Sequence, residues 1–130
     1  MLGAVTADGA EPRLFVVVLE GSSGAGGEYD RVEVEAVVDT GFDGALQLPP
    51  DIFRRLGHPY EGSTRGTLAD GSEAWFDYHT GKVLWHGAER DDVIVIAGDG
   101  DPLVGMALLG GSQLQVDVVP GGSVVVEELT

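Results

Sequence analysis

The stretch of residues 36–44 constrains this chain most, because an apolar run ends there directly on an acidic residue. The two valines before Asp39 have the character of the end of a buried strand. Burying a carboxylate costs roughly several kcal/mol unless it is paired or hydrogen-bonded. Gly41 and Gly44 permit a tight turn directly after the acid. The pattern predicts a carboxylate on rigid support at the floor of a site; a plain Asp-Thr-Gly turn that only bonds its neighbouring backbone is the alternative.

The composition indicates a small β-rich protein. A chain of 130 residues has the size of one domain, expected here to span residues 1–130. With 43% hydrophobic residues it can bury a modest core. The 21 glycines and many valines favour an all-β fold with many turns. The chain has no cysteine, which excludes disulfides and thiolate metal sites.

The charge narrows the range of partners. A formal net charge of −15 argues against nucleic acid and anionic membrane surfaces, because both would repel the chain. Residues 1–8 lack the basic region and the long apolar core of a secretory signal. No apolar run approaches the length of a membrane span. We therefore expect a cytoplasmic protein.

Most of the chain is predicted to form strands. The expected strands cover residues 13–20, 31–38, 45–48, 73–85 with a bend at 80–81, 92–97, 113–119 and 123–127. The segment 31–38 alternates cleanly, which puts its small apolar residues on one face and its charged residues on the other. With the preceding strand it is expected to form a hairpin that leads into the Asp39 turn.

Two short helices are predicted between the strands. Residues 50–57 begin with a proline and an acid, carry basic residues late and end on a glycine. Its buried face is expected to consist of Ile52, Phe53 and Leu56. Residues 102–111 have a proline at the start, apolar residues throughout and glycines at the end, which predicts a short buried helix.

Turn signals and small polar residues mark the connections. Asp70-Gly71 predicts a hairpin turn, and residues 86–90 predict a looser turn. Residues 1–12 are expected to be a frayed or edge segment. The glycine-rich residues 21–27 are expected to form a flexible loop; they open no helix, so they do not form a phosphate-binding loop.

No metal or cofactor is expected. His58, His79 and His86 follow no metal-ligand spacing, so surface or packing roles are favoured for them. The acidic pairs at 91–92 and at 99 and 101 lack the register of a calcium loop and are interpreted as solvated turns.

Three motifs in order resemble the retropepsin-like aspartic proteases. Residues 37–41, Val-Val-Asp-Thr-Gly, are similar to the catalytic turn of that family. Residues 67–73 match its flap hairpin by position, and residues 103–109 match the segment that ends in its single helix. The phrase Val-Asp-Thr-Gly-Phe-Asp-Gly, with Leu48-Pro49 after it, most resembles the small cellular members found in prokaryotes. The resemblance covers about residues 13 to 127.

The resemblance implies a fold and a site. The fold would be a small closed β-barrel of the acid-protease type, with a flap hairpin and one or two short helices. Each chain supplies one aspartate, so the enzyme would be a homodimer whose two Asp39 side chains meet at the twofold axis. Thr40 would brace the pair through the other chain's backbone, and Gly41 would contact the substrate main chain. The remaining implied substrate-binding residues are Asp43 and, in the flap, Leu68, Ala69, Asp70 and Gly71.

One position departs from the family's retroviral members. They carry an arginine after the glycine of the helix motif, where it pairs with the second aspartate; this chain has Met106 there. Asp43 therefore lacks that partner, and the arginines considered as replacements are Arg13, Arg54 and Arg55.

Two functions from different classes follow. The first is an aspartic endopeptidase that hydrolyses peptide bonds in peptides or proteins with two shared Asp39 carboxylates and no cofactor. The second is a catalytically silent module of the same fold that binds peptides or supports assembly, because fold alone does not establish activity. The intact Asp39-Thr40-Gly41 favours the first.

Overall fold

The computed structural model describes residues 1–19, 31–57, 61–68 and 70–130. The loop expected at 21–27, His58 and Ala69 lie outside the described residues. The strands are β1 (Leu2–Val5), β2 (Pro12–Leu19), β3 (Arg31–Val38), β4 (Leu46–Leu48), β5 (Gly62–Thr67), β6 (Glu73–Trp85), β7 (Ala88–Ala97), β8 (Leu103–Val104), β9 (Ser112–Val116) and β10 (Ser123–Glu128). The helices are α1 (Pro50–Arg55) and α2 (Met106–Leu109).

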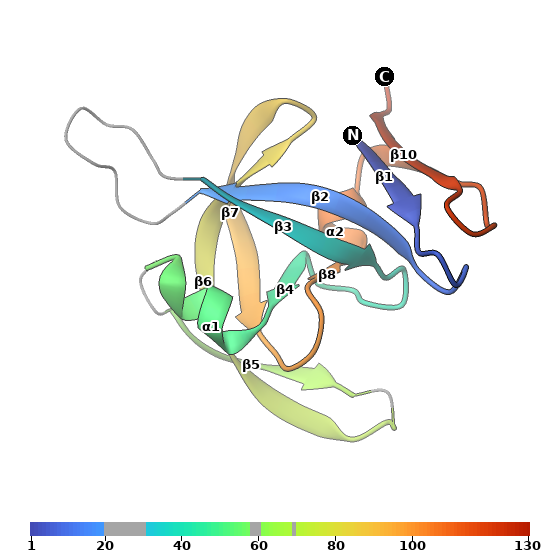
Figure 1. Ribbon diagram of the computed structural model, residues 1–130. Helices are drawn as coiled ribbons and strands as arrows, with labels where there is room; N and C mark the ends of the chain where they lie inside the picture. The colour runs from blue at the N-terminus through green and yellow to red at the C-terminus, as the bar shows by residue number, and fades with distance from the viewer. Residues whose placement is uncertain (20–30, 58–60, 69) are drawn as a thin grey trace.

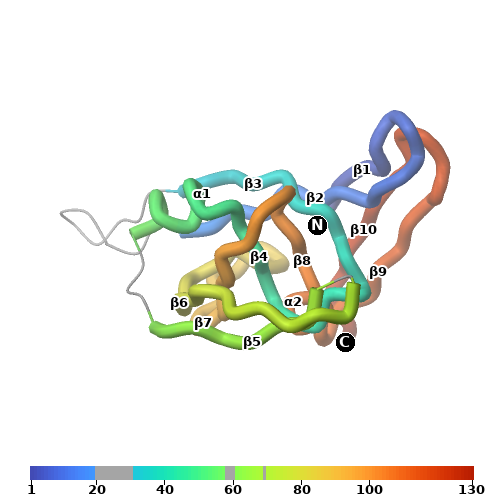
Figure 2. The backbone as a smooth tube through the Cα atoms, turned by 90° about the horizontal axis from the view of Figure 1, so that it is seen from below, coloured from blue at the N-terminus to red at the C-terminus, as the bar shows by residue number. Residues whose placement is uncertain are grey.

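The described strands form one sheet in the order β5-β6-β7-β4-β8-β3-β2-β1-β10-β9. An additional pairing between β2 and β6 curls the sheet back on itself (Figure 1). The predominance of strands confirms the expected β-rich class, whereas the closed barrel stays a prediction. Strands β1 and β10 lie at one end of the molecule in both views (Figures 1 and 2), and β9, which pairs with β10, lies beside them in Figure 2. Within the part of the chain that is described, no helix is long and apolar enough to cross a membrane.

The hairpin of β2 and β3 forms the part of the core that carries Asp39. The two strands pair antiparallel from Arg13 opposite Val37 to Leu19 opposite Arg31. The alternating residues of β3 are buried on one face and exposed on the other, as the sequence predicts. Because the side-chain period is two, a slip of one residue would expose all the buried positions, so the burial pattern fixes the register of β3.

Strands β6 and β7 form the longest hairpin. The irregularity in their pairing lies between Gly81 and Val83, next to the predicted bend. The looser turn expected at 86–90 is wrong. His86 and Gly87 both have positive φ, 53° and 77°, which a two-residue hairpin turn of type I′ requires. β7 therefore begins at Ala88, earlier than expected.

Three other expectations are wrong, the first two because of long-range strand pairing. Residues 1–12 are not a frayed or edge segment, because β1 pairs with both β2 and β10. Residues 102–111 are not all helical, because β8 lies between β3 and β4 and leaves only α2 as helix. The strand expected to reach residue 119 ends at Val116, and Val118 is 75% exposed.

Helix α1 has the expected limits to within two residues. Leu56, at its C-cap, is buried, while Ile52 and Phe53 are partly buried against the core. Arg54 and Arg55 lie in its last turn, where positive charge complements the helix dipole.

Candidate active site

Asp39 lies directly after β3 and is held by backbone hydrogen bonds on both sides. Its N–H donates to Val104 O at 2.9 Å, and its carbonyl accepts the N–H of Phe42 at 3.1 Å. Its carboxylate oxygen Oδ1 accepts the N–H of Gly41 at 2.9 Å. The side chain is partly buried. This hydrogen bond from Gly41 is the one expected of a simple Asp-Thr-Gly turn. It also fixes the orientation of the carboxylate.

A second segment, formed by β8 and the start of α2, holds the turn and the loop after it by hydrogen bonds. Strand β8 runs parallel to the end of β3, and the chain then passes through Gly105 into α2. The N–H of Gly105 donates to Ala45 O at 3.0 Å. The first two N–H groups of α2, from Met106 and Ala107, donate to Phe42 O at 2.8 Å and to Gly44 O at 3.1 Å. These donors have no partner inside the helix, so the loop after Asp39 satisfies them.

Two hollows flank the Asp39 turn. One, of about 390 Å³, is lined by Asp39 and Thr40 together with apolar residues of β9 and the bend after it, Leu114, Val116 and Val118. The other, of about 470 Å³, is lined by residues 42–45 of the same loop, so it contains Asp43 but not Asp39. Thr40, Gly41 and Asp43 are all exposed. The turn thus presents its predicted site residues to solvent on both sides of the loop.

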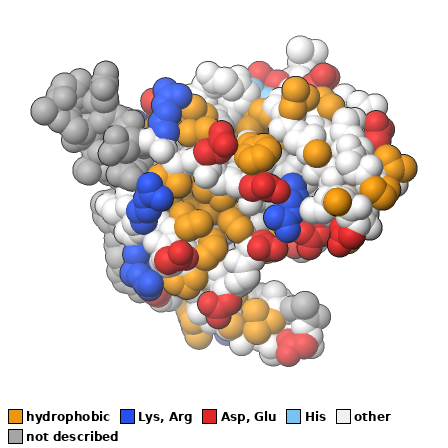
Figure 3. Space-filling view, viewed as in Figure 1, with side chains coloured by type: hydrophobic (Ala, Val, Ile, Leu, Met, Phe, Trp, Pro, Cys, Tyr) orange, Lys and Arg blue, Asp and Glu red, His pale blue; other side chains and the backbone are white. Residues whose placement is uncertain are grey.

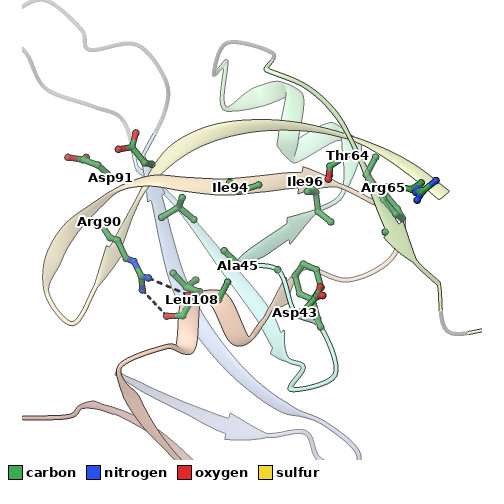
Figure 4. A pocket seen from close by; sticks show the side chains of 16 residues that line it. Asp43, Ala45, Thr64, Arg65, Arg90, Asp91, Ile94, Ile96 and Leu108 are labelled. Atoms are coloured by element: carbon green, nitrogen blue, oxygen red, sulfur yellow. Dashed lines mark hydrogen bonds between the residues drawn. The ribbon is translucent and has the colours of Figure 1, made fainter. Parts of the chain in front are cut away.

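The larger hollow is a pocket that apolar side chains and several charged residues line together. Asp43 and Arg90 lie toward opposite ends of it, with Ile94 and Ile96 of β7 between them (Figure 4). The β5–β6 hairpin contributes residues 64–66 and Phe76. In the space-filling view a notch separates the lobe formed by this hairpin from the body of the molecule (Figure 3). Such an apolar concave surface with a few polar groups is typical of a ligand pocket.

The β5–β6 hairpin has the position expected of a flap. At its tip Leu68 N–H donates to Ser72 O at 2.7 Å, and Gly71, with φ of 86°, donates to Leu68 O at 2.9 Å. Leu68, Asp70 and Gly71 are exposed. The pocket of 470 Å³ is lined by the base of the hairpin and by none of the described tip residues. Contact of the tip with a ligand would therefore require the hairpin to close.

The tip turn is expected to persist through mildly acidic pH. Hydrogen bonds from the Ser72 hydroxyl and from its backbone N–H lower the pKa of Asp70 from its ordinary value of 3.8. A lowered folded-state pKa stabilises the turn above the unfolded value, and this contribution is lost only as pH falls through the folded value. We expect an NMR titration of the Asp70 carboxyl carbon to give a midpoint below 3.8, and Ser72→Ala to raise it. A midpoint at or above the ordinary value in the wild-type chain would contradict this turn.

None of the three arginines proposed as ion-pair partners of Asp43 pairs with it in the described part of the chain. Arg13 forms ion pairs with Glu11 at 2.8 Å, Glu35 at 3.5 Å and Asp101 at 3.3 Å. Arg54 and Arg55 lie in α1, and neither lines the pocket that contains Asp43. None of the ion pairs found in the described residues involves Asp43. A further arginine that no sequence pattern marks, Arg90, lines the same pocket from β7, but it binds backbone carbonyls of α2 and lies toward the end opposite Asp43 (Figure 4).

His79 and His86 make packing and polar contacts. His79 is buried and stacks on Phe53 with ring centroids 4.2 Å apart. The ring of His86 is hydrogen-bonded to the Ser112 hydroxyl at 2.8 Å. Across the described ranges, no group of three His, Cys, Asp or Glu side chains is placed to hold a metal ion.

Comparison with known proteins supports the fold. No protein-family model matches the sequence, and no curated protein matches it significantly. Among solved structures, the chain is similar to a retropepsin-like aspartic protease from Rickettsia conorii. The sequences are 20% identical, the TM-score is 0.65, and the match covers 99% of this chain and 92% of that one. The resemblance seen in the motifs is thus confirmed at the level of the fold.

Proposed function

We propose that this chain is an aspartic endopeptidase that acts as a homodimer. The observation that carries the proposal is the placement of Asp39. It follows a strand whose one face is buried in the core, is oriented by the Gly41 N–H, and remains partly accessible at the edge of a hollow. The similarity of the whole fold to a retropepsin-like aspartic protease supports the same assignment. In the proposed enzyme the curled sheet is the closed barrel of that fold.

The second carboxylate comes from the second chain. Two carboxylates that meet across a twofold axis cannot both ionise easily, so the pair shares one proton. The ionised Asp39 takes a proton from a water molecule that attacks the scissile carbonyl carbon. The protonated Asp39 donates a hydrogen bond to the carbonyl oxygen and stabilises the charge that develops there. The reaction needs neither a covalent intermediate nor a cofactor.

The hollow beside Asp39 and Thr40 is the proposed contact with the second chain. Its apolar rim includes Leu114, Val116 and Val118, and a side chain such as Val118, which is 75% exposed, gains from being covered. Thr40, an exposed residue, lies beside Asp39 in the same hollow, where its hydroxyl would bond to the partner's backbone. This arrangement supports the proposed role of Thr40 as the brace of the carboxylate pair.

The substrate is proposed to lie between the Asp39 loop and the flap. An extended peptide forms strand-like hydrogen bonds, for which the exposed Gly41 and Asp43 offer backbone and carboxylate groups. Residues 68–71 of the flap tip would close over it and exclude water. The acidic surface gives no attraction for nucleic acid, and we place the enzyme in the cytoplasm with peptide or protein substrates.

A peptide-library experiment tests the proposal. Purified protein is incubated with the library from pH 4 to 8, and sedimentation is measured on the same samples. We expect cleavage at defined positions by a dimeric species, with loss of cleavage when dilution produces monomer, because each chain holds only half of the carboxylate pair. A dimer that cleaves nothing would favour the catalytically silent module, and cleavage by a monomer would contradict the shared pair.

A further inference from the structure

Arg90 makes a contact that the proposed function does not use. It lies in β7, and its side chain reaches across to the backbone of Ala107 and Leu108 in α2 (Figure 4). Nη1 donates to Leu108 O at 2.9 Å and Nη2 donates to Ala107 O at 3.3 Å. Within the described part of the chain Arg90 forms no ion pair, while its neighbours Glu89 and Asp91 pair with Lys82. The guanidinium is thus committed to backbone carbonyls.

Helix α2 needs such support. It has four residues, and an isolated helix of that length is unstable in water because nucleation is unfavourable. Its last turn contains no basic residue, and Gly110 and Gly111 follow. The carbonyls at the end of a helix lack intrahelical donors and carry the negative end of the dipole. Arg90 supplies from another strand both the hydrogen-bond donors and the positive charge that this helix lacks.

The other end of α2 holds the loop that follows Asp39. Met106 N–H and Ala107 N–H donate to Phe42 O and Gly44 O, and Phe42 N–H donates to Asp39 O. One continuous set of hydrogen bonds therefore runs from Arg90 through α2 and residues 42–44 to the Asp39 turn. Leu108, whose carbonyl Arg90 binds, is itself 1% exposed, so α2 packs against the core as a short rigid element.

We propose that Arg90 is a positioning residue for the Asp39 turn. By binding the C-terminal carbonyls of α2 it fixes the N–H groups of Met106 and Ala107 that hold the loop after Asp39. The kinetic part of this inference rests on the proposed function; the structural part does not. The result is a carboxylate held in the orientation that the pair requires, by a side chain that never contacts the substrate's reacting atoms.

Two variants of Arg90 separate the effect of its two hydrogen bonds from the effect of its positive charge. Arg90→Met removes both hydrogen bonds, and Arg90→Lys keeps the charge but loses the two-pronged geometry. Arg55→Met is the matched control, because it removes the charge of an exposed arginine in α1. Should Arg90→Met fail to fold, Arg90→Lys supports the same comparison with a smaller change.

The first measurement is amide hydrogen exchange by NMR, which needs no substrate. In Arg90→Met we expect the amides of Met106 and Ala107 to exchange about tenfold faster or more, while amides in β2 and β3 keep wild-type rates. Arg55→Met should leave all of them unchanged. Unchanged exchange at Met106 and Ala107, or equal acceleration throughout β2 and β3, would overturn the inference.

The second measurement is the split between kcat and KM. We expect Arg90→Met to lower kcat about tenfold to a hundredfold with KM changed by less than about threefold, and Arg90→Lys to fall in between. A raised KM with unchanged kcat would make Arg90 a substrate-binding residue and would overturn its positioning role. If the wild-type dimer cleaves no peptide, the proposed function fails, and the exchange rates alone decide whether Arg90 holds α2.

Discussion

Asp39→Asn is expected to abolish peptide cleavage at every pH from 4 to 8 while the protein stays folded. Asparagine cannot ionise, so it cannot take a proton from the attacking water, and general-base catalysis is worth about 10²–10⁴ in rate. Asparagine also lacks the acidic proton that the protonated Asp39 shares with the carbonyl oxygen, so the combined loss should exceed about 10³-fold. The measurement is kcat/KM on the best library peptide, at matched purity.

The folded state should tolerate this change. The amide oxygen of asparagine can accept the Gly41 N–H as Oδ1 of Asp39 does, so the turn keeps its hydrogen bond. We expect the free energy of unfolding to change by less than about 1 kcal/mol. Asp99→Asn is the control, because it makes the same charge change at an exposed residue that lines neither hollow beside the Asp39 turn. Cleavage by Asp39→Asn at the wild-type rate would refute the assignment of Asp39.

Mixing the two proteins tests whether the carboxylate pair is shared. When wild-type and Asp39→Asn chains exchange freely in equal amounts, about a quarter of the dimers carry two intact aspartates. Activity per wild-type chain should therefore fall to about half of its unmixed value. An enzyme that works with one Asp39 per active site would show no such loss. The mixture thus separates the dimeric mechanism from a monomeric hydrolase that happens to use the same residue.

The strands that could be predicted are those whose pattern is local. β3 alternates between buried and exposed residues along its length, and its own residues show this period of two. The Asp70-Gly71 turn is equally local, because glycine there adopts a positive φ of 86°. Such elements depend mainly on their own residues, so the sequence predicts them well.

The elements that were predicted wrongly depend on distant partners. The apolar residues 103–104 fit a helix by composition, but they pair with β3 on one side and β4 on the other. β1 is a short strand, and it is interior because it pairs with β2 on one side and with β10 on the other. A Cβ on Gly3 would run into the backbone carbonyl of Arg13, so the absence of a side chain there serves close strand contact rather than flexibility.

The sequence signals for the candidate site also differ in how local they are. Asp39 was predicted because the end of an apolar strand, the acid and the glycines are contiguous. The contact of Arg90 with α2 could not be predicted, because its partners are backbone carbonyls and no side-chain pattern marks them. Arginine in a strand that faces a short helix without basic residues of its own is the only signal, and it exists only once the two elements are known to pack together.

Gly105→Ala is expected to destabilise the protein by about 2–4 kcal/mol and to displace the loop after Asp39. Gly105 is buried, and its φ of −113° is open to any residue, so the constraint comes from space rather than from backbone conformation. An added Cβ would collide with the Gly44 carbonyl oxygen and would lie 2.6 Å from Phe42 O and 2.5 Å from Phe42 Cδ2. Two of these atoms are the acceptors that bind the start of α2, so the strain falls on the link between α2 and the Asp39 loop.

The matched control lies at the other end of the same helix. At Gly110 an added Cβ would find its nearest neighbour, Ala107 O, at 3.6 Å, an ordinary van der Waals contact. Gly110→Ala should therefore keep the wild-type unfolding midpoint, whereas Gly105→Ala should lower Tm by about 10 °C for a chain of this size. Equal midpoints for the two variants would show that residues 42–45 can move away at little cost. That result would also weaken the role of α2 in holding Asp39, because the loop would then not be fixed by its contact with Gly105.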